Sequence, residues 1–125
     1  MKHLMMLLAI LVALECQSQT KNDMKSTTIE VVTFSVKAGI SNEEASEKLS
    51  LLNEIVKGYD GFIKRTFSVN EEGQWIYIVH WTSKELALKA AEDVAKNQKA
   101  GAVFEIIDES SISMNHYEII NSFNN

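Results

Sequence analysis

Two patterns of apolar residues alternate along the chain from about residue 28. Runs rich in β-branched and aromatic residues predict strands over residues 29–36, 62–69, 75–81 and 112–120. Between them, apolar residues recur every three or four positions, which predicts helices over about 42–57 and 83–97 and a further helical piece over 100–107. The order strand–helix–strand–strand–helix–strand predicts an α+β, ferredoxin-like βαββαβ fold. With right-handed crossovers, this order gives a four-stranded antiparallel sheet with its helices on one face.

Local signals support these boundaries. Ser41 and Glu44 have the spacing of a capping box at the start of the first helix, and Thr82 and Glu85 repeat it before the second. Residues 70–73 form a predicted hairpin turn, in which Gly73 supplies a positive φ.

The two predicted central strands carry apolar side chains at both alternating positions. Helices on one side of the sheet leave the other side uncovered, and soluble proteins rarely expose a large apolar patch. We therefore expect a homodimer in which two sheets pack face to face, with a cavity between them.

The first residues differ from the rest. Residues 4–14 are an unbroken apolar run after Lys2 and His3, too short to span a bilayer and typical of a secretory signal. We expect a signal peptide over 1–18, cut after Ser18, then a linker over 19–27, a domain over 28–121 and a tail over 122–125. The mature protein is then periplasmic or secreted, without an integral membrane segment. A buried N-terminal helix is one alternative, and a lipid anchor on Cys16 is another, which the preceding Glu15 disfavours.

The composition of the chain argues against several classes of function. The chain has 125 residues, of which 46% are hydrophobic and 23% charged, with a formal net charge of −5. An acidic chain without clustered Lys and Arg predicts no nucleic-acid binding. Cys16 is the only cysteine, so the domain has no intramolecular disulfide, thiol nucleophile or cysteine-based metal site.

Two histidines and three aromatic residues on the strands are the candidates for chemistry. His116 could act as a general base, because histidine titrates near neutral pH, and His80 could contact the ligand. Trp75, Tyr77 and Trp81 could stack on a flat ligand, with Phe104 as a further contact. The alternative is structural: His116 hydrogen-bonded in the sheet beside Glu118 or Asn115, and the aromatic residues packed in the core or the dimer interface.

Strand alternation limits these combinations. His80 shares a face with Ile76 and Ile78, whereas Trp75, Tyr77 and Trp81 lie on the other face. His80 and the aromatic residues are therefore not expected in one cavity. Two histidines on different strands, without cysteine or paired carboxylates, predict no metal site.

Four segments resemble the dimeric α/β-barrel superfamily and, within it, the antibiotic-biosynthesis-monooxygenase-like proteins. They are the opening strand running into VKAGIS, the segment YDGFIKRTF, the segment IYIVHWTSKELALKAAE and the ending MNHYEII. Asp60 stands where that family commonly has proline. The segment after the second helix lacks a Ser-Pro-His-Phe-like motif and is more similar to an uncharacterised subgroup.

The resemblance implies a dimer that binds a small, flat, mostly apolar ligand and acts as a cofactor-independent monooxygenase. In this interpretation His116 is the base, Tyr77 is a hydrogen-bond donor, and no cofactor is needed. A non-catalytic module that binds a ligand or a protein is the alternative. Haem degradation, known among related barrels, would need a histidine on the helix over residues 83–96, which has none.

Overall fold

The structure, a computed structural model, describes residues 25–125. The expected signal peptide and residues 19–24 of the expected linker lie outside the described residues. The elements follow the predicted order, with the second helical region divided in two and a short 3-10 helix before the last strand. They are β1 (Thr28–Ser35), α2 (Asn42–Val56), β2 (Phe62–Val69), β3 (Gln74–Trp81), α3 (Lys84–Lys96), α4 (Gln98–Phe104), η1 (Glu109–Ser111) and β4 (Ser113–Glu118).

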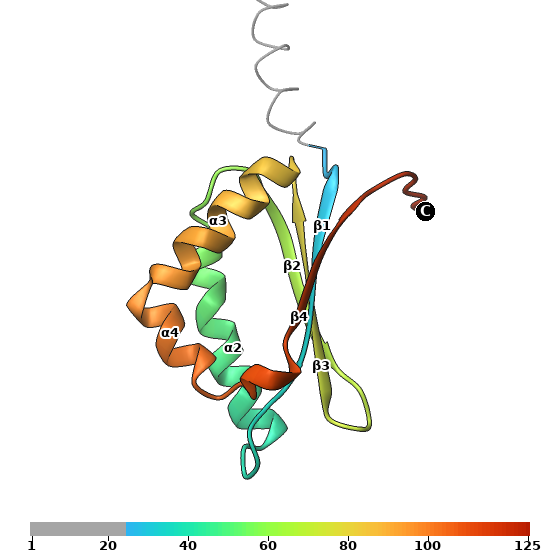
Figure 1. Ribbon diagram of the computed structural model, residues 1–125. Helices are drawn as coiled ribbons and strands as arrows, with labels where there is room; N and C mark the ends of the chain where they lie inside the picture. Colours follow the sequence, from blue (N-terminus) through green and yellow to red (C-terminus); the bar gives the residue numbers. More distant parts are fainter. Residues whose placement is uncertain (1–24) are drawn as a thin grey trace, which may run out of the picture.

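The four strands form one antiparallel sheet in the order β2-β3-β1-β4. Strands β3 and β1 are therefore central, as their apolar composition predicts. Helices α2, α3 and α4 all lie on the same side of the sheet (Figure 1), which confirms the α+β, ferredoxin-like fold. Among residues 25–125, no helix is long and apolar enough to cross a membrane.

The starts of the helices follow from their caps. Ser41 caps α2, and its hydroxyl accepts a hydrogen bond from the amide of Glu44, as predicted. The second cap is Ser83, not Thr82, and it accepts from the amide of Leu86. Thr82 continues the sheet pairing one residue beyond β3, since its amide donates to the carbonyl of Gly61.

Asn97 separates α3 from α4. It ends α3 with extended backbone (φ −79°, ψ 124°), and its side chain accepts from the amide of Ala100 at the start of α4. The helical piece expected over 100–107 therefore begins two residues earlier and ends at Phe104. Ile107 lies beyond it and forms an isolated bridge with Val36 at the end of β1.

The core lies between the sheet and the helices. Val32 and Phe34 of β1 and Trp75, Val79 and Trp81 of β3 point to the helix layer and are buried. They meet small or branched side chains of the helices: Ala45, Leu49, Leu52, Ala87, Ala90, Ala100 and Val103. The hairpin between β2 and β3 turns at Gly73, whose φ of +81° agrees with the prediction.

The opposite face of the sheet has no helix over it. The pairing of β1 with β3 places Val31 beside Ile78, Ile29 beside His80 and Thr33 beside Ile76. These residues are only half-buried, and Tyr117 of β4 is 53% exposed next to Ile29. We call Ile29, Val31, Ile76, Ile78 and Tyr117 the open-face stripe.

Candidate functional site

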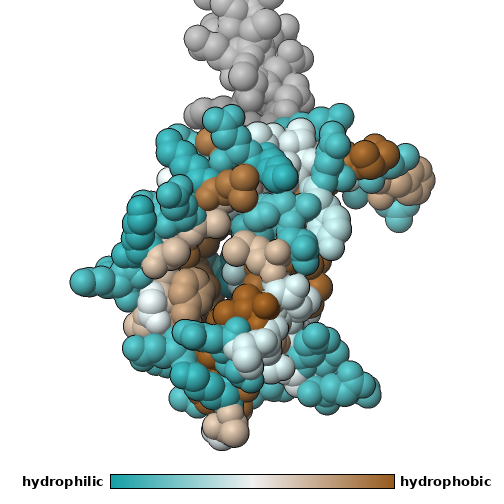
Figure 2. All heavy atoms as spheres, in the orientation of Figure 1, coloured by the Kyte–Doolittle hydropathy of each residue, from teal (hydrophilic) through white to brown (hydrophobic). Residues whose placement is uncertain are grey.

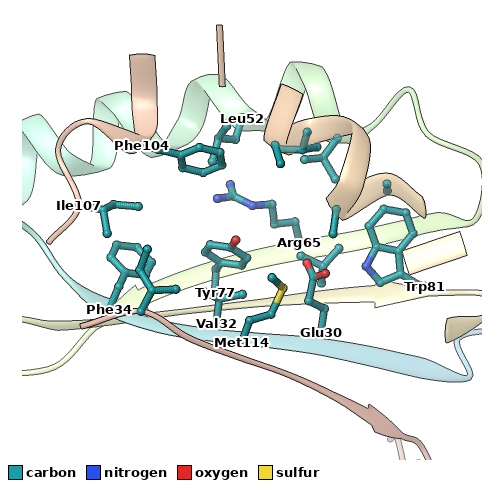
Figure 3. Close-up of a pocket in the computed structure, with 17 residues that line it drawn as sticks. Glu30, Val32, Phe34, Leu52, Arg65, Tyr77, Trp81, Phe104, Ile107 and Met114 are labelled. Atoms are coloured by element: carbon teal, nitrogen blue, oxygen red, sulfur yellow. The ribbon is translucent and has the colours of Figure 1, made fainter. Parts of the chain in front are cut away.

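A cavity of about 200 Å³ lies between the sheet and the helices. Figure 2 shows it as a hollow between the two layers, with hydrophobic residues around it. The sheet wall consists of Glu30, Val32, Phe34, Arg65, Tyr77, Val79, Trp81 and Met114. The wall opposite is apolar and comes from the helices and the segment after them: Leu52, Val56, Ala90, Ala91, Val94, Ala95, Phe104, Ile107 and Ile112. Most of the lining is apolar, and all of its ionisable groups are on the sheet (Figure 3).

Glu30 is a carboxylic acid inside this apolar wall. It shares a strand face with Val32 and Phe34, so the β1 backbone directs it toward the helices, and only 7% of the residue is exposed. Burial raises the pKa of Glu30, while the hydrogen bond and charge of His116 and the charge of Arg65 oppose that rise. Glu30 is therefore placed to hold or accept a proton inside the cavity.

His116 lies behind Glu30 on the neighbouring strand β4. Its Nε2 and Glu30 Oε1 are 3.0 Å apart, and both side chains are nearly buried. On its other side, His116 lines a separate surface pocket with Thr28, Lys84 and Glu118. The Glu30–His116 pair therefore connects the cavity to the protein surface.

Arg65 enters the cavity from β2. Its Nη1 donates to the carbonyl of Leu49 (3.2 Å) and to Asn53 Oδ1 (2.8 Å) on α2, which fixes the guanidinium across the cavity. The guanidinium carbon lies 4.9 Å from the ring centre of Tyr77 and 5.1 Å from that of Phe67. Burial lowers the pKa of Arg65, although the neighbouring Tyr77 and Glu30 favour its charged form.

Buried hydrogen-bond donors also face this space. Among residues 25–125, three buried side-chain nitrogens have no hydrogen-bond partner: Arg65 Nη2 and Trp81 Nε1, which belong to cavity-lining residues, and Trp75 Nε1, which does not. Figure 3 shows the indole nitrogen of Trp81 on the ring edge toward Glu30, and the Tyr77 hydroxyl directed toward Arg65. Burial, together with the charge of Glu30, raises the pKa of Tyr77 to about 12, so its hydroxyl stays protonated at neutral pH.

The structure brings together only some of the residues predicted for the site. Tyr77, Trp81 and Phe104 line the cavity. Trp75 is absent from the lining and is buried in the core, with its ring 6.5 Å from that of Phe34 in a stacked arrangement. This position favours the structural interpretation of Trp75.

The two candidate histidines have different positions. His80 points to the open face, away from Tyr77 and Trp81, as strand alternation predicts. Burial and the charge of Lys64 lower the pKa of His80. His116 shares the cavity side of the sheet, but its hydrogen-bond partner is Glu30 rather than Glu118 or Asn115. That partner lies on the adjacent strand, directly opposite His116 in the β1–β4 pairing.

Glu30 and Arg65 are functional candidates that the sequence analysis missed. Each shares a strand face with apolar core residues, Glu30 with Val32 and Phe34, and Arg65 with Phe67 and Val69. A charged residue at a core-facing position is a signal that could have identified both, since such residues are rarely buried without a partner. Arg65 is also the only arginine among the 12 Lys and Arg residues of the sequence.

The cavity lacks the histidine ligand that a haem iron would need. Among the described residues no histidine lines it, and α3 contains no histidine. In residues 25–125, no three His, Cys, Asp or Glu side chains gather closely enough to hold a metal ion. The groups that the cavity does present are a proton acceptor, a cation and hydrogen-bond donors, which suit proton removal from a bound organic molecule.

Comparison with known proteins supports the fold. No protein-family profile and no curated protein match the sequence. A proposed antibiotic biosynthesis monooxygenase from Bordetella bronchiseptica aligns over 78% of this chain and 100% of its own, with a TM-score of 0.66 and 13% identity. A dimeric ferredoxin-like protein from an uncultured marine organism aligns over 85% of this chain and 98% of its own (TM-score 0.60, 17% identity).

A third similar structure is SnoaB, a cofactor-independent oxygenase from Streptomyces nogalater. It covers 80% of this chain and 97% of its own, with a TM-score of 0.57 and 14% identity. The chain therefore has the ferredoxin-like fold of the antibiotic-biosynthesis-monooxygenase-like proteins. At these identities the likeness concerns the fold, and any activity has to be argued from the cavity.

Proposed function

We propose that the protein binds a small, flat, mostly apolar molecule in the cavity between its sheet and its helices. The sequence predicts a ligand between two sheets of a dimer, a location that involves a second chain. The cavity within one chain is the better ligand site, because it combines apolar walls with buried polar groups. Its volume of about 200 Å³ lies below the range of roughly 300–1,000 Å³ usual for drug-sized ligands, which favours a small molecule.

We further propose that the protein is a cofactor-independent oxygenase in which Glu30 is the catalytic base. Glu30 removes a proton from an activated CH₂ group, and the resulting carbanion reduces dioxygen, the co-reactant. The CH₂ group and dioxygen become a carbonyl group and water, so that no further reductant is consumed. The single observation that carries this proposal is a carboxyl group buried in an apolar cavity, where burial raises its pKa.

His116 then has a different role from the one expected. His116 does not line the cavity, so Glu30 takes its place as the base. His116 then acts as a positioning and relay residue. His116 holds the Glu30 carboxyl group and passes the proton on to the surface pocket that it also lines. Tyr77 keeps its expected role as a hydrogen-bond donor to the ligand.

Oxygen uptake with anthrones and hydroxynaphthalenes tests the oxygenase. Glu30→Gln, which keeps the side-chain shape, should lower kcat by about a hundredfold or more, since general bases contribute roughly that much. Glu47→Gln, a matched change at an exposed position of α2, should leave kcat unchanged. Full activity of Glu30→Gln would refute the assignment of the base.

Ligand binding without turnover would favour the alternative, a non-catalytic binding module. Calorimetry on the same compounds separates the two functions. The buried carboxyl group favours the enzyme, because a purely apolar ligand gains nothing from it.

We also propose that the protein is exported, on the basis of the apolar run at residues 4–14 and the small residues that follow it. Sequencing the N-terminus of protein recovered from the cell envelope or the medium tests this. Gln19 as the first residue would support cleavage after Ser18, and an acylated Cys16 would identify a lipoprotein instead. An intact Met1 would contradict both forms of processing.

A further inference from the structure

The segment that follows β4 carries the two large apolar residues that are most exposed in the described part of the chain. Ile120 is 86% exposed and Phe123 is 92% exposed. An aromatic ring that lies almost wholly in water forgoes the stabilisation that burial of such a ring usually provides. We call residues 120–125 the arm. Its own chain leaves both apolar side chains of the arm almost uncovered.

The arm leaves the sheet on the side that has no helices. The amide of Ile119 donates to the carbonyl of Thr27 at 2.8 Å, which continues the pairing of β4 with β1 one residue beyond Glu118. The chain then bends away from the sheet on the side opposite α2, α3 and α4 (Figure 1). Figure 2 shows hydrophobic residues of this segment standing clear of the rest of the molecule. The arm therefore begins beside Tyr117 of the open-face stripe and points away from its own sheet.

The charge of the open face suits contact with a second copy of this chain. The chain has 17 Asp and Glu residues and a formal net charge of −5. None of those acids is among the described strand residues that share a face with the open-face stripe. Apart from Lys64 and His80, the polar residues of this face are Ser, Thr, Asn, Gln and Tyr. The arm has no charged side chain either. Two acidic chains can therefore meet here without repulsion between carboxylates, which is costly at other contacts.

The arm is long enough to reach a second sheet. An extended chain advances by about 3.3 Å per residue, so Phe123 can lie about 13 Å beyond Ile119. Sheets that pack face to face are about 10 Å apart. Phe123 can therefore reach the margin of a sheet packed on the open face. In a two-fold dimer each chain gives one arm and receives another, so every arm contact occurs twice.

We infer that the arm clasps a second copy of this chain, with Ile120 and Phe123 packed against the margin of the partner's sheet. The inference extends the homodimer expected from the open-face stripe and is independent of the proposed cavity function. In this arrangement the stripe forms the centre of the interface, and Phe123 is an aromatic anchor beside it. Large aromatic residues contribute strongly to such interfaces when they become buried.

Sedimentation equilibrium tests the arm by measuring the dissociation constant of the dimer. The proteins compared are wild type, Phe123→Asn, a chain shortened to end at Ile119, and Leu51→Asn. Leu51 is 58% exposed on α2, so Leu51→Asn removes an exposed apolar side chain from the helix side of the sheet.

Phe123→Asn should raise the dissociation constant by about tenfold or more, because both chains lose an anchor. The shortened chain should dissociate at least as readily, since it lacks Ile120 as well. Leu51→Asn should change the constant by less than about twofold. Far-UV circular dichroism should show wild-type secondary structure for all of them, because the arm contributes nothing to the core. Should the shortened chain fail to fold, Phe123→Asn decides alone.

Photo-cross-linking provides a readout of direct contact. Benzoylphenylalanine at position 123 should join two chains, with the cross-link mapped to one of the four strands, whereas the same group at position 51 should not. A shortened chain or Phe123→Asn that dimerises as tightly as wild type would overturn the inference and leave the homodimer standing. Cross-links from position 123 that stay within one chain, or that form only with a different protein, would also overturn it. A monomeric wild-type protein would overturn both the arm contact and the dimer.

Discussion

A single carboxyl group, Glu30, differs most from its surroundings. The other cavity-facing residues of β1 are Val32 and Phe34, and a charged group among them loses most of its hydration. One side-chain hydrogen bond compensates for this loss, and its partner is His116, which lies 86 positions away in the sequence. Glu30 is thus tolerated by the fold rather than required by it, which is common for functional residues.

The stability of the protein should therefore depend on the charge of Glu30. Its pKa is raised in the folded protein, so the folded state keeps this proton to a higher pH than the unfolded chain does. As pH rises from below the ordinary glutamate range through the folded-state pKa, wild-type protein should lose stability relative to Glu30→Gln. Urea unfolding at a series of pH values measures this difference.

The exposed acid Glu118 provides the control for that titration. Glu118→Gln should keep the pH dependence of wild-type protein, because the carboxyl group at position 118 is exposed on β4. A stability difference between wild-type protein and Glu30→Gln that does not vary with pH would contradict the raised pKa.

The limits of sequence-based prediction are clearest for Glu30 and Arg65. The alternation of β3 correctly separates Tyr77 and Trp81 from His80, since side chains of one strand alternate by geometry. The burial of Glu30 and Arg65 depends instead on partners in other elements, His116 of β4 and Asn53 of α2. No local pattern encodes those contacts.

Among the elements, α3 begins at a residue that the sequence leaves ambiguous. Thr82 and Ser83 are both good capping residues, and Thr82 has the better spacing to Glu85. In the structure Thr82 continues the sheet through its amide, which pairs with Gly61, and Ser83 caps the helix. Most other boundaries follow the hydrophobic pattern to within about two residues, since α2, β2 and β3 have strong and uninterrupted periodicity.

Ser83→Ala should lower the free energy of unfolding by about 1 kcal/mol, the usual cost of a lost N-cap. Thr82→Ala should cost less, because the backbone bond from Thr82 to Gly61 remains. Thermal or urea unfolding of both variants compares them directly. A larger loss of unfolding free energy for Thr82→Ala than for Ser83→Ala would indicate that Thr82 is the cap.

Helix α3 packs closely on the sheet through small residues. Ala87 is fully buried at this contact. Ala87→Leu should destabilise the protein by about 1–3 kcal/mol, because close-packed interiors accommodate added volume poorly. Ala102→Leu, on an exposed position of α4, is the matched control and should change stability little. Equal effects of the two substitutions in urea unfolding would contradict tight packing under α3.

For the whole molecule, the open-face stripe is the feature that a single chain leaves unexplained. Its residues lie on the two central strands and on β4, with no helix over them. A second copy packed face to face would cover them. The homodimer is therefore our expectation for this protein in solution.

Light scattering coupled to size exclusion should give the mass of two chains at micromolar concentration. Ile78→Glu, at the centre of the stripe, should shift the protein to one chain, because it would bury a charge in the interface. Ser50→Glu, an equal change of charge on the exposed side of α2, should leave the dimer intact. A wild-type mass of one chain would refute the dimer.

The division of the cavity between its two layers has an evolutionary consequence. Every ionisable group in the lining comes from the sheet, whereas α2, α3 and α4 contribute only apolar surface. Substitutions in the helices can therefore enlarge or narrow the cavity while its ionisable groups stay in place. A change of the angle between α3 and α4 at Asn97 could do the same. A lineage with this architecture can explore new ligand sizes one helix residue at a time without rebuilding its reactive centre.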